Sequence, residues 1–330
     1  MESWFTYLTG VEEHSPEQVR SQLHLEGSCL TSLANNKSYE CGTLEIPTLA
    51  ELRKNSSLVQ ALGQLKVREL IGNVQDFQLD PQNEGCLFQA ASQFNLLEMI
   101  DSRTIPEEGI GIYEYDRTQG PACAIACGAG TIYRNYLVPL EGQIGQSKKL
   151  QIDCMEDLSI PLGNQMNHRW KMQNGYLLIK SKEALDVINK KILAISHEER
   201  EALKGKLKIG LQWNTQVTLH NCQHLLSQAY CSALPVSYNE LPPQLWEPFA
   251  RLILEAAYEA TMHAALINFQ QTGKSKVFLT LLGGGAFGND TDWIFESINK
   301  VMDTFEHTPL QVYFISYQHP HPRIEEILRA

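Results

Sequence analysis

The chain has 330 residues, of which 43% are hydrophobic and 20% charged, and its formal net charge is -11 at pH 7. This composition is typical of a globular protein with a substantial core, and the negative charge disfavours a surface built to bind bare nucleic acid. No apolar run approaches membrane-spanning length, the first residues lack the form of a secretion signal, and the eight cysteines show no metal-binding or disulfide pattern, so we expect a cytoplasmic protein with no membrane contact, metal or cofactor.

The first 68 residues mix polar turns with short amphipathic segments. Ser15-Pro16-Glu17 and Thr48-Leu49 are each typical of a helix start. Nothing in this segment indicates chemistry. We therefore predict an N-terminal helical extension over residues 1–68, packed on a domain that occupies residues 69–330.

A buried strand is predicted within residues 86–95, because an apolar run there ends in small and amide residues. Open α/β sheets bind ligands at the carboxyl ends of their strands, so Gln93 and Asn95 are candidate ligand contacts. Helix capping by Ser92 or Asn95 explains the same residues equally well.

A polar loop over residues 110–121 carries two acidic residues, Glu114 and Asp116. Carboxylates in such a loop are candidates for a general base or for orienting a sugar hydroxyl. The alternative is that both are solvated loop charges.

A run of small residues follows from 122 to 136 and permits close packing or close approach of a ligand. Within it, Gly128-Ala129-Gly130 is a second and weaker candidate for a phosphate-binding loop. Cys123 has no histidine near it in the sequence, which favours a packed thiol over a nucleophile.

Residues 142–205 are charged and irregular, and we expect them to form an insertion or a lid. Regular patterns return with strands predicted at 207–211, 216–219 and 229–238. A long helix is predicted over residues 243–269, where apolar residues recur at spacings of three and four.

The most informative stretch covers residues 277–289, where an apolar, β-branched run breaks into Gly283-Gly284-Gly285. A helix is predicted to start near Trp293. A glycine loop between a strand and a helix N-terminus surrounds an anion, above all a diphosphate, with backbone N–H groups. A tight turn without a ligand is the alternative. With a last strand at 310–317, the alternation of strands and helices predicts a three-layer α/β/α sandwich.

The order helix, strand, Gly-Gly-Gly-Ala-Phe-Gly, helix, strand resembles the second half of a macrodomain, a fold that binds ADP-ribose. In the first half, residues 72–74 and 89–92 are similar to the family's Gly-Asp-Ile and Asn-Ala-Ala-Asn motifs. Residues 118–121 and 133–136 resemble a divergent group, the MavL-type ADP-ribosyl hydrolases. The resemblance covers about residues 70–317 and implies a macrodomain-like sandwich with a mixed central sheet.

Two departures from the family pattern shift the expected contacts. Asn73 stands where an adenine-binding Asp is usual, which leaves Asp76 as a substitute. Gln89 and Ser92 replace two asparagines, which points to Gln93 or Asn95 at the distal ribose. Together, the residue patterns and the resemblance give these ligand-binding candidates: Asp76, Phe77, Gln93, Asn95, Gln119, Gly128, Gly283, Gly284, Gly285, Ala286, Phe287, Gly288, Asn289 and Tyr317.

The catalytic candidates are Glu114 and Asp116 on one loop and Asp290 and Asp292 just beyond the glycine loop. Helix capping is an equal alternative for the last two. The resemblance implies a protein that binds ADP-ribose and hydrolyses it from protein side chains, with ubiquitin or arginine as candidate targets. The alternatives are a non-catalytic reader of ADP-ribose and a hydrolase of free ADP-ribose derivatives.

Overall fold

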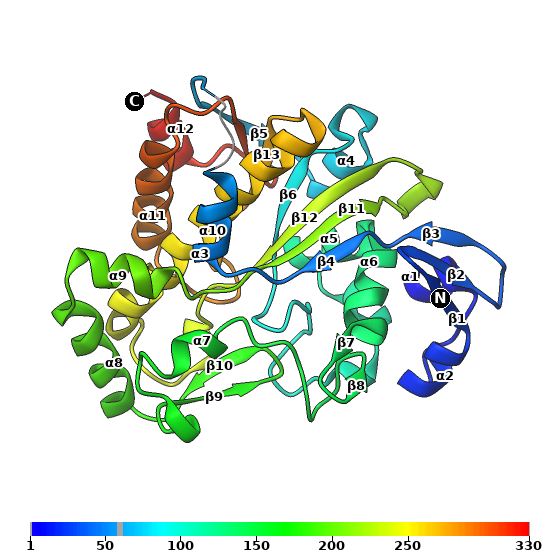
Figure 1. Ribbon diagram of the computed structural model, residues 1–330, viewed down its shortest axis with the longest axis horizontal. Helices are drawn as coiled ribbons and strands as arrows, with labels where there is room; N and C mark the ends of the chain where they lie inside the picture. Colours follow the sequence, from blue (N-terminus) through cyan, green and yellow to red (C-terminus); the bar gives the residue numbers. More distant parts are fainter. Residues whose placement is uncertain (1, 58–61, 330) are drawn as a thin grey trace.

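The computed structural model describes residues 2–57 and 62–329. A seven-stranded sheet runs through the centre of the molecule in the order β4-β11-β12-β6-β13-β14-β5 (Figure 1). Its strands are β4 (Thr43–Glu45), β5 (Lys66–Ile71), β6 (Leu87–Ala91), β11 (Gly210–Gln216), β12 (Leu225–Cys231), β13 (Lys276–Leu279) and β14 (Gln311–Ser316).

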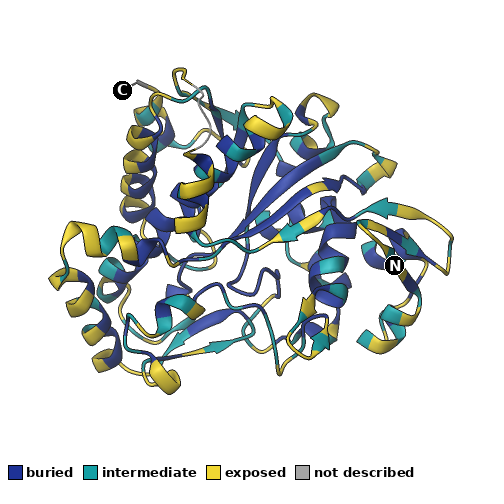
Figure 2. Cartoon of the chain, viewed as in Figure 1, coloured by how far each residue is buried: buried dark blue, intermediate teal, exposed yellow. Residues whose placement is uncertain are grey.

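The sheet is mixed. The five strands from β12 to β5 run parallel to one another, whereas β11 and β4 are antiparallel to their neighbours. The central strands are buried on both faces and appear dark blue in Figure 2, as expected of parallel strands covered on both sides. Phe88 of β6 stacks on Phe278 of β13 with ring centroids 4.1 Å apart, which fixes the register of the two strands at the centre of the core.

Helices cover both faces of the sheet (Figure 1). One layer contains α3 (Leu49–Ser56), α10 (Glu247–Thr272) and α11 (Thr291–Thr304), and the other contains α4 (Val74–Leu79), α5 (Gln119–Ala126) and α6 (Gly128–Ile132). The three-layer α/β/α sandwich with a mixed sheet is therefore confirmed. The long helix, the helix after the glycine loop and the last strand all form where the sequence predicts them.

The N-terminal segment contains strands as well as the helices expected of a helical extension. Besides α1 (Trp4–Thr9) and α2 (Pro16–Ser21), it forms a small antiparallel sheet, supplies the edge strand β4 and ends inside β5, so residue 68 is no boundary in the sheet. Strands of three or four residues are too short to show a periodicity in the sequence. The small sheet consists of β1 (Leu23–Glu26), β2 (Cys29–Ser32) and β3 (Ser38–Glu40).

The predicted insertion, residues 142–205, contributes no strand to the central sheet among its described residues. It lies along the lower and left edge of the molecule in Figure 1. Two hairpins and three helices account for it and the residues just before it: β7 (Pro139–Leu140) with β8 (Gln143–Ile144), β9 (Trp170–Gln173) with β10 (Tyr176–Ile179), α7 (Glu156–Ser159), α8 (Lys182–Ala194) and α9 (His197–Lys204).

Three strand predictions after the insertion are wrong in their limits. The strands expected at 207–211 and 216–219 are one strand, β11, with a bulge between Gln212 and Thr215. The strand expected at 229–238 is β12, which begins at Leu225 and ends at Cys231, and a short 3-10 turn follows Pro235. The chain ends in a last helix, α12 (Pro322–Arg329), and no helix among the described residues is long and apolar enough to cross a membrane.

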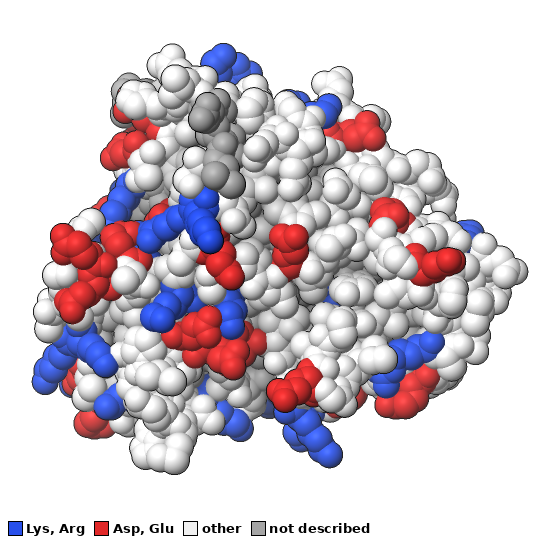
Figure 3. Space-filling model, viewed as in Figure 1, with Lys and Arg blue, Asp and Glu red and all other residues white. Residues whose placement is uncertain are grey.

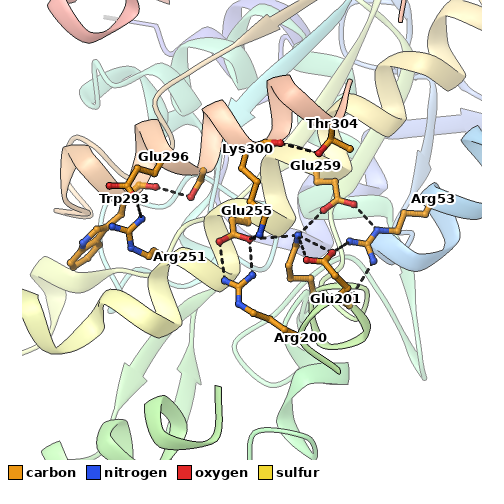
Figure 4. Close-up of polar contacts among 12 residues, drawn as sticks. Arg53, Arg200, Glu201, Arg251, Glu255, Glu259, Trp293, Glu296, Lys300 and Thr304 are labelled. Atoms are coloured by element: carbon orange, nitrogen blue, oxygen red, sulfur yellow. Dashed lines mark hydrogen bonds and ion pairs between the residues drawn. The ribbon is translucent and has the colours of Figure 1, made fainter. Parts of the chain in front are cut away.

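Ion pairs join α3, α9, α10 and α11 (Figure 4). The buried Lys204 Nζ lies 2.9 Å from Glu259 Oε2 and 3.0 Å from Glu201 Oε1. Arg53 also pairs with Glu259, and Arg200 and Lys300 pair with Glu255. Acidic and basic side chains lie next to one another on the left side of the face drawn in Figure 3.

Candidate functional site

A crevice opens at the carboxyl ends of the parallel strands. The chain leaves β6 toward α5 on one face of the sheet and leaves the neighbouring β13 toward α11 on the other face. Loops that diverge in this way leave room for a ligand between them. Two adjoining cavities lie here, with volumes of about 230 Å³ and 440 Å³. We call them the glycine-loop cavity and the Tyr317 cavity; they share Asp116, Thr118, Gln119 and Thr280.

The glycine loop has a defined shape. Gly283 and Gly288 have φ of 72° and 68°, in the left-handed region that favours glycine. The N–H of Asn289 donates to Gly283 O at 2.9 Å, and the N–H of Gly288 donates to Gly285 O at 3.0 Å. The buried Asn289 side chain donates to Leu234 O at 2.8 Å and lines neither cavity, so it anchors the loop.

Part of the loop backbone is free to bind a ligand. The N–H groups of Gly283, Gly285, Ala286 and Phe287 find no acceptor within the described residues, and all four residues line the glycine-loop cavity. Gly284 does not line it. Successive free N–H groups on a loop before a helix form a site that favours an anion.

Three aromatic rings form one wall of the same cavity. Phe287 lies with its ring centroid 5.5 Å from that of Tyr176 and 5.6 Å from that of Tyr238. Tyr176 comes from β10 of the insertion, so a segment that carries no motif reaches the site. The sequence offered no signal for this contact, because it depends on how a distant hairpin packs.

The two loop carboxylates predicted at 114 and 116 do lie at the crevice. Asp116 lines both cavities, and its Oδ1 accepts from the Thr118 N–H at 2.8 Å. Glu114 lines the Tyr317 cavity, and its Oε2 accepts from the Trp4 N–H at 3.1 Å. Asp116 is therefore the better placed of the two to reach a ligand that spans both cavities.

Asp290 and Asp292, the other two predicted catalytic residues, lie outside both cavities. Asp290 caps α11, and its Oδ1 accepts from the Asp292 N–H at 2.8 Å. The Asp292 carboxylate pairs with Arg323 of α12. The start of a helix draws these acids to its own N–H groups and to a nearby cation.

The predicted amides mostly build the walls. Gln93 lines the glycine-loop cavity, but its amide bonds to both the N–H and the carbonyl of Met99. Gln119 lines both cavities and uses its amide to hold the carboxyl end of β6, by bonds to Ala91 N and Gln89 O. Asn95 lines neither cavity and bonds to the Leu97 N–H.

Three further candidates are placed elsewhere by packing. Gly128 lies buried at the start of α6, where a Cβ atom would come within 2.7 Å of Trp4 and 2.8 Å of Leu8, so its lack of a side chain permits close packing. Asp76 is exposed on α4 and Phe77 packs beside Gly72, and neither lines a cavity.

Tyr317, a predicted ligand contact, lines the Tyr317 cavity and is 72% exposed. Asn73, at the position usual for an adenine-binding Asp, also lines it, although its Oδ1 caps α4 by accepting from the Gln75 N–H at 3.0 Å. This end of the crevice is open to solvent.

Cys123 is fully buried, and burial raises the pKa of its thiol, as expected for a packed side chain. No group of three or more His, Cys, Asp or Glu side chains among the described residues is arranged to hold a metal ion.

One residue that lines the glycine-loop cavity was not predicted from the sequence. Glu98 is buried and lines the glycine-loop cavity, and neither of its carboxylate oxygens has a hydrogen-bond partner among the described residues. Burial raises its pKa to about 8, against the opposing effects of Arg134 and Ser92. The one feature of the sequence that could have identified Glu98 is its position as a lone acid within the apolar run 96–100.

No model of a known protein family matches the chain, and no curated protein matches its sequence. Among solved structures, the chain is similar to poly(ADP-ribose) glycohydrolase from Thermomonospora curvata, with a TM-score of 0.48, 9% identity and 95% of each chain covered. It is also similar to the Deinococcus radiodurans glycohydrolase in complex with ADP-ribose, with a TM-score of 0.45, 9% identity and coverage of 87% of this chain and 93% of that chain. These likenesses are distant, and the function proposed below rests on this chain's own cavities.

Proposed function

We propose that the protein binds ADP-ribose across the two cavities and hydrolyses the bond between ADP-ribose and a protein side chain. The observation that carries the proposal is the set of free backbone N–H groups at Gly283 and residues 285–287, beside a cavity that also contains Asp116. An anion site next to a carboxylate suits a ligand that joins a diphosphate to a reactive sugar.

The shape of the crevice suits this ligand as well. ADP-ribose has a nucleoside and a second ribose joined by a diphosphate, and the crevice has two cavities that share a wall at Asp116, Thr118, Gln119 and Thr280. In the proposed complex the adenosine occupies the larger cavity beside the exposed Tyr317 ring. The second ribose then lies in the smaller glycine-loop cavity.

Asp116 is proposed to act as the general base. It takes a proton from a water molecule whose oxygen bonds to the anomeric carbon, while the bond from that carbon to the side-chain atom breaks and its electron pair leaves with that atom. The glycine loop holds the diphosphate, so the ribose is positioned before the reaction begins. Ubiquitin and proteins modified on arginine are the candidate substrates.

Calorimetric titration with ADP-ribose tests the binding step. A Cβ atom at Gly285 meets open space, so Gly285→Ala is a control that leaves the loop intact, and Gly285→Glu adds a negative charge beside the free N–H groups. We expect wild type and Gly285→Ala to bind alike, and Gly285→Glu to bind at least about 100-fold more weakly. A folded wild type that gives no binding overturns the proposal.

Release of ADP-ribose from modified proteins tests the chemistry. We expect wild type to release it and Asp116→Asn to bind ADP-ribose but release it slowly. Binding without release by wild type, over a panel of linkages, would instead establish a reader. Faster cleavage of free ADP-ribose derivatives than of modified protein would establish a metabolite hydrolase.

A further inference from the structure

Glu98 lines the glycine-loop cavity, and no described residue donates a hydrogen bond to either of its carboxylate oxygens. Its nearest cation is Arg134, whose Nη2 lies 3.8 Å away, beyond hydrogen-bond distance. Both side chains are almost wholly inaccessible to solvent, at 1% and 0%. A buried charge without hydrogen bonds is costly, so this arrangement calls for an explanation.

Arg134 is held by other groups. Its Nε donates to Leu96 O at 3.1 Å, its Nη2 donates to Thr131 Oγ1 at 3.1 Å, and its guanidinium carbon lies 3.6 Å from the centroid of the Tyr230 ring. A hydrogen-bonded ion pair would place a carboxylate oxygen within hydrogen-bond distance of one of these nitrogens. Arg134 instead fixes the backbone at Leu96, two residues before Glu98, and its ion pair with Glu98, at 3.8 Å, includes no hydrogen bond.

We propose that Glu98 is the general acid that protonates the departing side-chain atom, and that the site therefore serves linkages with a strongly basic leaving group. The inference rests on the proposed hydrolysis. As the bond from the anomeric carbon breaks, its electron pair moves to the departing oxygen or nitrogen, and that atom receives the proton of Glu98. Asp116 receives a proton from the attacking water, and exchange with solvent restores both groups.

The two carboxyl groups occupy different environments, as such a division of roles requires. Glu98 lies at the buried side of the glycine-loop cavity, whereas Asp116 is partly exposed where the two cavities meet. A carboxyl group without solvent or hydrogen bonds keeps its proton at neutral pH and can donate it. The raised pKa of Glu98 agrees with this geometry.

A general acid at Glu98 favours leaving groups that need a proton when they depart. A serine-type alkoxide or a guanidine nitrogen needs a proton as it departs, whereas a carboxylate released from an ester does not. The proposed substrates are therefore ADP-ribose linked to a hydroxyl or guanidine side chain, and esters of acidic side chains gain little from Glu98.

The pH dependence of kcat/KM for the wild-type protein is expected to follow the protonation of Glu98. The acid works when protonated, so kcat/KM should fall as pH rises past about 8. Burial raises the pKa of Tyr113, Tyr230, Tyr176 and Cys123 further from neutrality. The other charged or titratable groups that face Glu98 or line its cavity are Arg134, Asp116, Tyr238 and Cys231.

The experiment compares two leaving groups on the same sugar: an alkyl alcohol and 4-nitrophenol, each joined to the anomeric carbon of the distal ribose of ADP-ribose. 4-Nitrophenolate departs without a proton. We expect Glu98→Gln to slow hydrolysis of the alkyl substrate by about 10²–10⁴-fold and of the nitrophenyl substrate by no more than about tenfold. Glu141→Gln, an exposed acid, is the matched control and should change neither rate.

Equal loss on both substrates by a Glu98→Gln protein that still binds ADP-ribose overturns the role of Glu98, and so does no loss on either. If that variant does not fold, wild type decides alone: the loss of activity above pH 8 must occur with the alkyl substrate and be absent with the nitrophenyl substrate. Binding of ADP-ribose with no hydrolysis of either substrate by wild type refutes the proposed function itself.

Discussion

The guanidinium carbon of Arg134 lies 3.6 Å from the centroid of the Tyr230 ring, and both side chains are fully buried. A desolvated cation over an aromatic face contributes about 2 kcal/mol. Removing the ring should therefore cost more than removing its hydroxyl, which donates to Gln228 Oε1 at 2.5 Å. We expect Tyr230→Leu to lower the free energy of unfolding by about 2 kcal/mol more than Tyr230→Phe does, measured by urea denaturation. Equal effects of the two changes would show that the hydroxyl alone matters.

Lys204 should stabilise the fold in a pH-dependent way. Burial raises the pKa of Glu259, but bonds from His263, Arg53 and Lys204 outweigh it and hold that pKa below its ordinary value of 4.5. A depressed carboxyl pKa contributes stability that is present above the unfolded pKa and is lost as pH falls through the folded pKa. We expect Lys204→Met to lower the free energy of unfolding by about 3 kcal/mol at pH 7, and by progressively less as pH falls below about 4.

The neighbouring Lys206, which is exposed, provides the control for this change. Denaturation of Lys206→Met should match that of wild type at both pH values. If Lys204→Met lowers the free energy of unfolding by the same amount at every pH, the loss of stability comes from packing and not from the carboxylates around Lys204.

Asp116 and Asp292 should differ in their effect on turnover. Asp116 lines both cavities, whereas Asp292 pairs with Arg323 outside them. We expect Asp116→Asn to lower kcat by about 10²-fold or more, the range for loss of a general base, and Asp292→Asn to stay within about twofold of wild type. Steady-state kinetics on one modified protein measures both, and the reverse order would restore Asp292 as a catalytic candidate.

Gly128 should affect stability and not binding. A Cβ atom there would meet Trp4 and Leu8, and overpacking of this kind costs about 1–3 kcal/mol. We therefore expect Gly128→Ala to lower the melting temperature and to leave the Kd for ADP-ribose unchanged. Weaker binding with unchanged melting would return Gly128 to the list of phosphate contacts.

Local patterns predicted the elements that form the frame of the site. The apolar run before Gly283 makes β13, the spacing of apolar residues makes α10, and the acid at position 290 caps α11. Each of these features is decided within a few neighbouring residues, because periodicity, glycine and capping act over one or two turns of chain.

Packing between distant segments decided the rest. The hairpin of β9 and β10 brings Tyr176 against Phe287, and the N-terminal segment encloses Gly128. Short strands such as β4 form by pairing with the edge of the existing sheet, and no local sequence pattern predicts them.

The α/β layering and the position of a glycine loop at the end of a central strand could be predicted from the sequence, since both follow from local backbone preferences and burial. Which acids face the crevice depends on tertiary packing. Asp292 is drawn to Arg323, and Glu98, which looks like an isolated charge in an apolar run, lines the cavity. The direction of a side chain is set by the residues packed around it, and those residues come from parts of the chain far away in sequence.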